Sequence, residues 1–269
     1  MAKRRYIFLI DSVHKYWVLF LNLIFPIECF GCGREDTWLC SECFDKIIFR
    51  KSQSCLDCKT KNQWGEFCNN CCERYYLDGV WIAADYEQEL VAKLIKSYKY
   101  HFVKDISLIL AKILIQFLDG KINETKNFDF KIAGLDWKMF DQIKARPKVL
   151  LDFQNNLIMP VPLSKKRLKW RGFNQAEIIA NILADNFKLE IDAKNLKRIK
   201  NTKPQAKLNE RERRNNLADC FSWLGDKLNG RNIILVDDVA TTGSTLNECA
   251  KVLKQAGASE VWGLVVANG

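Results

Sequence analysis

Two adjacent carboxylates, Asp237 and Asp238, follow residues 231–236, a run typical of a strand buried in a parallel sheet. A turn rich in hydroxyl groups comes next and leads into the apolar periodicity of a helix over 244–255. Such a turn offers backbone N–H groups and the positive end of the helix dipole, which together suit a phosphate group. The turn consists of Thr241, Thr242, Gly243, Ser244 and Thr245.

The two carboxylates indicate what kind of phosphate compound the turn would bind. Carboxylates repel a bare phosphate, whereas they accept hydrogen bonds from sugar hydroxyls and ligate divalent cations. The presence of Asp237 and Asp238 therefore indicates that the ligand of this turn is a sugar phosphate. The alternative is an ordinary strand-to-helix connection with Thr or Ser as the N-cap, but that connection needs neither carboxylate.

This segment resembles the phosphoribosyl pyrophosphate (PRPP) signature of the type I phosphoribosyltransferases. The resemblance implies that Asp237 and Asp238 hold the ribose hydroxyls as catalytic residues, and that residues 241–245 cradle the 5′-phosphate. It also implies Mg²⁺ bridging the ribose and the pyrophosphate. The reaction would be displacement at the anomeric carbon of the ribose, driven by positioning and by stabilisation of the departing pyrophosphate.

Positive charge is concentrated in the middle of the chain. Residues 163–214 hold 15 Lys and Arg against 6 Asp and Glu, which accounts for +9 of the formal net charge of +10. This cluster predicts a polyanionic partner, and a solvated basic face is the alternative. Lys165, Lys166 and Arg167 follow the expected strand 157–163, where they would neutralise a pyrophosphate group.

The rest of the basic segment suits either a single-stranded nucleic acid or a loop that closes over the phosphate site. Trp170 and Phe173 would stack on bases, and core packing is the alternative for each ring. Residues 198–214 would close over the site or follow a nucleic-acid backbone. The residues assigned to these two roles are Arg171, Phe173, Asn174, Gln175, Arg198, Gln205, Arg211, Arg213 and Arg214.

Nine of the eleven cysteines lie between residues 29 and 72, mostly as Cys-x-x-Cys pairs. In a chain without a secretory signal this pattern predicts metal ligands rather than disulfides. Two tetrahedral Zn²⁺ sites with structural roles are expected, because four thiolates leave no open position. The predicted ligands are Cys29, Cys32, Cys40 and Cys43 for one ion and Cys55, Cys58, Cys68 and Cys71 for the other.

Two points about these ligands stay open at the level of sequence. Interleaved ligation is an alternative to sequential pairing, and Cys72 is an alternative to Cys71. The two isolated cysteines, Cys220 and Cys249, are expected to be buried thiols.

Further motifs extend the resemblance to the whole chain. The segment Pro160-Val-Pro-Leu-Ser, the run from Arg171 to Gln175, and Thr202-x-Pro-Gln occur together with the phosphate turn and the cysteine pairs. This combination resembles the ComF family of competence-associated proteins. The resemblance implies a role with incoming single-stranded DNA in natural transformation, beside proteins of the competence machinery. Two alternatives stay open: a working phosphoribosyltransferase with an unknown nucleophile, and a non-catalytic PRPP sensor or scaffold.

Strands alternating with helices predict an α/β fold with a doubly wound parallel sheet of the type I phosphoribosyltransferase kind. Helices are expected over 87–100, 105–118 and 174–187, with Asn174 as an N-cap, and a last strand over 260–267. The expected divisions are a leading helix (1–28), a double zinc ribbon or knuckle module (29–75) and the phosphoribosyltransferase-like domain (76–269). Residues 120–156 resemble an insertion or a long excursion.

The first 28 residues superficially resemble a signal peptide. Asp11, His14 and Lys15 interrupt the apolar stretch, and no small-residue cleavage site follows Pro26. The apolar run is also too short to span a bilayer. We therefore expect an amphipathic helix on a cytoplasmic protein, with peripheral membrane contact as the alternative.

Overall fold

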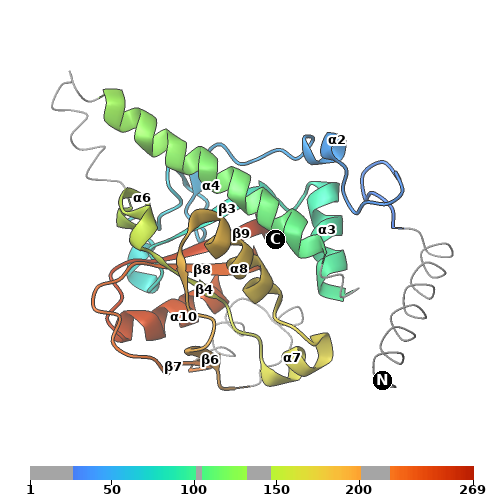
Figure 1. Ribbon diagram of the computed structural model, residues 1–269. Coiled ribbons are helices and arrows are strands. Elements are labelled where there is room, and N and C mark those ends of the chain that lie inside the picture. Colours follow the sequence, from blue (N-terminus) through green and yellow to red (C-terminus); the bar gives the residue numbers. More distant parts are fainter. Residues whose placement is uncertain (1–26, 101–104, 132–146, 201–218) are drawn as a thin grey trace, which may run out of the picture. The chain divides into compact units, whose positions relative to one another are not determined.

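The computed structural model describes residues 27–100, 105–131, 147–200 and 219–269 (Figure 1). The chain separates into two compact units, residues 1–47 and 48–269. The second cysteine quartet therefore belongs to the larger unit. The leading helix expected over 1–28 lies almost entirely outside the described residues.

The smaller unit is a cysteine-bearing loop followed by the short helix α2, Ser41–Phe44. An isolated bridge joins Glu28 and Glu35, and the amide of Cys29 donates to the carbonyl of Arg34 at 2.8 Å. The rings of Phe30 and Trp38 stack with centroids 5.6 Å apart. These contacts bring the first four thiols together.

The larger unit is built on a parallel sheet of five strands, in the order β3-β9-β8-β4-β5. The strands are β3 (Gly79–Asp85), β4 (Leu157–Pro160), β5 (Glu190–Ile191), β8 (Ile233–Ala240) and β9 (Val261–Asn268). Their central residues are almost all buried, as expected for a sheet covered on both faces. The predicted parallel α/β fold is confirmed.

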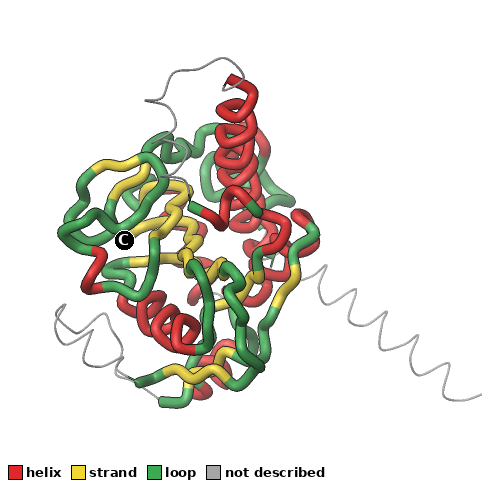
Figure 2. The backbone as a smooth tube through the Cα atoms, turned by 90° about the vertical axis from the view of Figure 1, so that its left-hand side faces the viewer, coloured by secondary structure: helices red, strands yellow, loops and turns green. Residues whose placement is uncertain are grey.

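Helices cover both faces of this sheet (Figures 1 and 2). On one face α4 (Ile106–Lys131) packs against α8 (Gln175–Phe187) and against β9, and α3 (Glu89–Tyr100) packs on α4. On the other face α10 (Ser244–Gln255) contacts β8 and β9. The connections to β5 and to β9 thus use opposite faces, which is the doubly wound arrangement.

The second cysteine quartet lies on the α10 face of the sheet. Its ribbon is formed by β1 (Gln53–Ser54), β2 (Lys61–Asn62) and the 3-10 turn η1 (Cys72–Arg74). The Gln53 side chain joins the ribbon to β3, because it both donates to and accepts from the backbone of Ile82 at 3.1 and 3.0 Å. Members of the ribbon share a core cluster with α10 and the strands, including Cys55, Leu56, Phe67 and Cys71.

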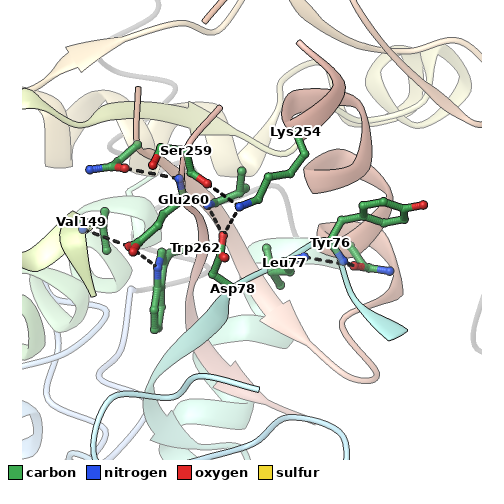
Figure 3. Close-up of polar contacts among 11 residues, drawn as sticks. Tyr76, Leu77, Asp78, Val149, Lys254, Ser259, Glu260 and Trp262 are labelled. Carbon is green, nitrogen blue, oxygen red and sulfur yellow. Dashed lines mark hydrogen bonds and ion pairs between the residues drawn. The ribbon is translucent and has the colours of Figure 1, made fainter. Parts of the chain in front are cut away.

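The segment between the ribbon and β3 is also held by polar contacts (Figure 3). The Asp78 carboxylate accepts from the amide of Val261 at 2.6 Å and pairs with Lys254 of α10 at 2.7 Å. Asn247, also on α10, accepts from the amides of Tyr76 and Leu77. The ribbon is therefore fixed to α10 and β9 at its exit.

Several elements differ from the sequence-based expectation. Helix α4 runs to Lys131 instead of ending at 118, so the first part of segment 120–156 is helical. The end of that segment forms the short turns α6 (Lys148–Leu151) and η2 (Phe153–Asn155), and residues 132–146 lie outside the described residues. A short helix, α7 (Lys165–Arg171), and an antiparallel pair, β6 (Leu196–Arg198) with β7 (Phe221–Trp223), had not been predicted.

Candidate functional site

A crevice opens where β4 and β8 part. Their pairing ends at Pro160 and Val236, whereas β8 remains paired with β9 as far as Ala240. From β4 the chain continues to β5, and from β8 it continues to β9 on the other side. This is the switch point of the sheet, where open parallel sheets bind their ligands.

The crevice contains a cavity of about 490 Å³. Nine residues assigned from sequence to the ligand, to nucleic acid or to the loop line it: Arg167, Arg171, Asn174, Gln175, Arg198, Asp237, Asp238, Thr241 and Thr245. They come from α7, the start of α8 with its N-cap, β6, β8, the turn after β8 and the start of α10. Residues far apart in the sequence thus face one volume.

Other predicted site residues lie elsewhere. Lys165 and Lys166 are exposed on the first turn of α7 and do not line the cavity. Trp170 lines it and is 59% exposed, so core packing does not hold for this ring. The Phe173 ring lies 6.2 Å from that of Tyr98 and is half-buried. Gln205, Arg211, Arg213 and Arg214 lie outside the described residues.

The carboxylates lie on β8 itself rather than after its end. Asp238 is buried, and its carboxylate pairs with the Lys99 ammonium group at 2.9 Å. The Asp237 carboxylate accepts from the amide of Asp238 at 2.8 Å. Burial, and then the charge of Asp238, raise the pKa of Asp237 to about 7, although Lys99 acts in the opposite direction.

Lys99 was not identified from the sequence. It is the next-to-last residue of α3, and nothing in its spacing distinguishes it from Lys93 and Lys96 on the same helix. Burial lowers its pKa, but the Asp238 carboxylate outweighs that effect and the net pKa is raised. Lys99 therefore stays charged at the floor of the cavity.

Three arginine side chains, Arg167, Arg171 and Arg198, also line the cavity. Arg171 donates to the Gln175 side chain at 2.9 Å, which orients it along the start of α8. Burial lowers the pKa of Arg198, and the charge of Arg167 lowers it further. Like charges gathered at a cavity wall favour an anionic ligand, because such a ligand relieves their repulsion.

Two amide side chains complete the wall between β4 and α8. Asn174 occupies the predicted N-cap position, but its side chain does not cap α8 and donates instead to the carbonyl of Val161 at 3.1 Å. The main-chain carbonyl of Gln175 accepts from the Tyr98 hydroxyl at 2.9 Å. Within the described residues, Asn174 Oδ1 and Gln175 Nε2 are buried without a hydrogen-bond partner. Both residues line the cavity.

The turn after β8 leads directly into the N-terminus of α10. Gly243 has φ 71°, in the left-handed region, and α10 begins at Ser244 as expected. The hydroxyl groups of Thr242 and Ser244 lie 2.7 Å apart, and the amide of Ser244 donates to Thr242 Oγ1 at 3.4 Å. Of the five residues of the turn, Thr241 and Thr245 line the cavity.

Both cysteine quartets form compact clusters. Within each, the four sulfur atoms lie within 4.8 Å of one another, and the members are the two sequential sets predicted from spacing. Cys71 belongs to the second cluster and is 1% exposed, whereas the exposed Cys72 thiol donates to the carbonyl of Asn69. Four thiols at this spacing fit a tetrahedral zinc ion. Cys220 and Cys249 are buried, as expected.

The sheet, its crevice and the two thiol clusters define a phosphoribosyltransferase-like domain joined to a double zinc ribbon. Residues 170–268 match the family described as Phosphoribosyl transferase domain, and residues 20–72 match the Double zinc ribbon domain. Competence protein F of Haemophilus influenzae is 31% identical over 252 residues, which cover 90% of this chain and 98% of that protein. The chain belongs to the ComF family of competence proteins.

Two further relatives match over shorter stretches. DNA utilization protein YhgH of Escherichia coli (strain K12) is 38% identical over 107 residues, 39% of this chain and 47% of that protein. Competence protein ComFC of Bacillus subtilis (strain 168) is 39% identical over 102 residues, 38% of this chain and 39% of that protein. Among the described residues, no helix combines the length and apolarity needed to cross a bilayer.

Proposed function

We propose that the chain binds PRPP with Mg²⁺ in the crevice between β4 and β8 and handles single-stranded DNA during DNA uptake. The observation that carries the proposal is that Asp237 and Asp238, the turn that enters α10 and several arginine side chains line one cavity. The match to competence protein F over nearly its full length supports the biological role.

Each part of the cavity suits one part of PRPP. The turn at 241–245 offers amides and hydroxyls to the 5′-phosphate, and the two carboxylates accept from the ribose hydroxyls. The wall with Arg167 and Arg198 would hold the pyrophosphate. Mg²⁺, when bound, would neutralise charge on that pyrophosphate. A bare phosphate would leave the carboxylates facing an anion, which disfavours it.

The basic wall also favours transferase activity as a second candidate function. In the displacement, the nucleophile forms a bond to the anomeric carbon while the bond from that carbon to the pyrophosphate oxygen breaks. Pyrophosphate leaves with the electron pair, and the proton of the nucleophile passes to solvent. Arg167, Arg171 and Arg198 would stabilise the departing anion in place. A sensor that binds PRPP without turning it over is the remaining alternative.

Pyrophosphate release from PRPP and Mg²⁺ decides between these functions. It should be measured with and without single-stranded DNA or free bases. The test variant is Asp237→Asn/Asp238→Asn, and the control is Asp185→Asn/Asp226→Asn, which removes the same charge from exposed positions. Release that falls about 100-fold or more in the test variant alone establishes an enzyme. PRPP binding without release, lost in the same variant, establishes a sensor, and no PRPP binding refutes the proposal.

Binding of single-stranded DNA is tested separately, by its dependence on salt. Binding through the basic residues around α7 releases counterions, so affinity should fall steeply as salt rises. Affinity that does not change between low and moderate salt would exclude a phosphate-backbone contact by this face.

A further inference from the structure

Leu56 of the second cysteine ribbon lies directly against the phosphate turn. It is 3% exposed and sits between the ligand positions Cys55 and Cys58. A Cβ added to Gly243 would come within 2.4 Å of Leu56 Cδ2. Gly243 is therefore required for two reasons, its left-handed φ of 71° and the space that the Leu56 side chain takes.

The segment that leaves the ribbon toward β3 contacts the first turn of α10 at a second point. Asn247 Oδ1 accepts from the amide of Tyr76 at 2.7 Å and from that of Leu77 at 3.3 Å (Figure 3). The amide of Asn247 in turn donates to the carbonyl of Gly243 at 2.8 Å. The ribbon and the segment that follows it therefore contact both the turn and the helix start that would bind the 5′-phosphate.

The ribbon has little regular structure of its own. Its two strands have two residues each, and its other internal contacts are a few hydrogen bonds, the stacked rings of Phe67 and Tyr75 and one ion pair. Cys55, Leu56, Phe67 and Cys71 also pack into the core cluster that the ribbon shares with α10. Asp57, next to Leu56, pairs with Arg74 at 2.6 Å and accepts from the Tyr75 hydroxyl at 3.0 Å. A loop of this kind depends on metal ligation for its shape. The position of Leu56 then depends on the ion held by Cys55, Cys58, Cys68 and Cys71.

We propose that Leu56 is a positioning residue for the phosphate turn, and that loading of the second cysteine cluster with zinc thereby sets the affinity for the sugar phosphate. The proposal rests on the function proposed above for the identity of the ligand. Its mechanical part, the support of the turn by Leu56, does not depend on that identity. Coupling of this kind is reciprocal, so the bound ligand also tightens the hold on the metal.

The first test compares Leu56→Ala with Leu228→Ala. Both residues are buried, at 3% and 4% exposed, and belong to the same core cluster, but Leu228 lies at the other end of α10, where its amide donates to Ala256. Calorimetric titration of zinc-loaded protein with PRPP and Mg²⁺ should show a dissociation constant raised about tenfold in Leu56→Ala only. Leu56→Met, which nearly conserves the volume of the side chain, should have a dissociation constant close to that of the wild type. Equal effects of the two alanine variants, or none, would overturn the proposal.

The second test needs no ligand. Hydrogen exchange of the amides of residues 241–247 should be faster in Leu56→Ala than in the wild type, at unchanged zinc content by elemental analysis. Leu228→Ala should leave that stretch as it is. If the wild type fails to bind PRPP, the proposed function fails, but exchange still decides on Leu56. Unchanged exchange at 241–247 in Leu56→Ala would refute the positioning role even where PRPP binds.

Discussion

Asp237 and Asp238 lie side by side on β8, and the Lys99 ammonium group pairs with Asp238. Burial of the Asp237 carboxylate, and then its repulsion with that of Asp238, raise the pKa of Asp237 to about 7. A cation or a row of hydroxyl donors would relieve the repulsion when it binds. The unliganded site is therefore poised to take up such a ligand, and its electrostatics can be tested by pH.

The raised pKa of Asp237 predicts that this residue destabilises the unliganded protein at high pH. The folded state binds the proton more tightly than the unfolded chain, whose aspartates titrate near pH ~4, so the contribution is favourable at low pH and lost as pH rises through about 7. Asp237→Asn should raise the free energy of unfolding at pH ~8 by about 2–4 kcal/mol, with the gain vanishing toward pH ~4. Urea titrations across this range measure it. Asp185→Asn, an exposed control, should show no such pH-dependent gain.

Removal of the Lys99 charge should shift the pH dependence of ligand binding. Its charge lowers the pKa of Asp237, so Lys99→Met should raise that pKa further. The pH at which affinity for PRPP and Mg²⁺ is half-maximal should then move up by about one unit. Lys96→Met, which removes an exposed charge from the same helix, is the matched control. An unchanged midpoint in Lys99→Met would show that the ion pair does not control the site.

At the scale of elements, α7 joins the crevice to the outer surface. Ser164 caps it by accepting from the amide of Arg167, and Gly172 ends it with φ 76°. Between these caps it carries Lys165, Lys166 and Trp170, all exposed. An exposed aromatic ring among lysines is what stacking on a single strand requires.

Trp170→Ala should therefore weaken binding of single-stranded DNA. Loss of one stacked base is worth about 1–3 kcal/mol, or roughly 5- to 150-fold in affinity. Fluorescence anisotropy with a labelled oligonucleotide, in the absence of PRPP, measures the change. Leu168→Ala removes another exposed apolar side chain from α7 and should have little effect. Equal losses in the two variants would point to a general role of α7 instead of stacking.

The elements also show what the sequence can and cannot predict. Helix α10 was predicted over its full length, because its apolar residues repeat with helical period directly after the hydroxyl-rich turn. Strand β8 was expected to end at 236 but continues to Ala240, because its partner β9 extends alongside it. Helix α7 was missed because it has no apolar face, and β6 with β7 because three-residue strands carry no period.

The site follows the same pattern. Local motifs singled out the turn and both carboxylates, which line one cavity, and the eight thiols, which form two clusters, since each motif depends on spacing within a short segment. Lys99 and the support from Leu56 depend on contacts between segments far apart in the sequence. Such contacts leave no periodic signal in the chain.

For the whole molecule, the two thiol clusters differ in what they stabilise. The first lies in the unit 1–47, and the second lies in the unit that contains the sheet. Cys55 and Cys71 are 0% and 1% exposed and belong to the core cluster beneath α10. Loss of the second ion should therefore open the core of the larger unit, because the thiols would lose their ligation there and the ribbon its shape.

Cys32→Ser and Cys58→Ser test this difference, since each removes the exposed member of its quartet. Elemental analysis should find about one zinc ion lost in each variant. Cys58→Ser should lower the midpoint of thermal unfolding of the sheet, followed by circular dichroism, by about 10 °C, as a loss of about 3 kcal/mol implies for a unit of this size. Cys32→Ser should leave that midpoint nearly unchanged. Equal shifts of the midpoint in the two variants would contradict the prediction that only the second ion stabilises the sheet.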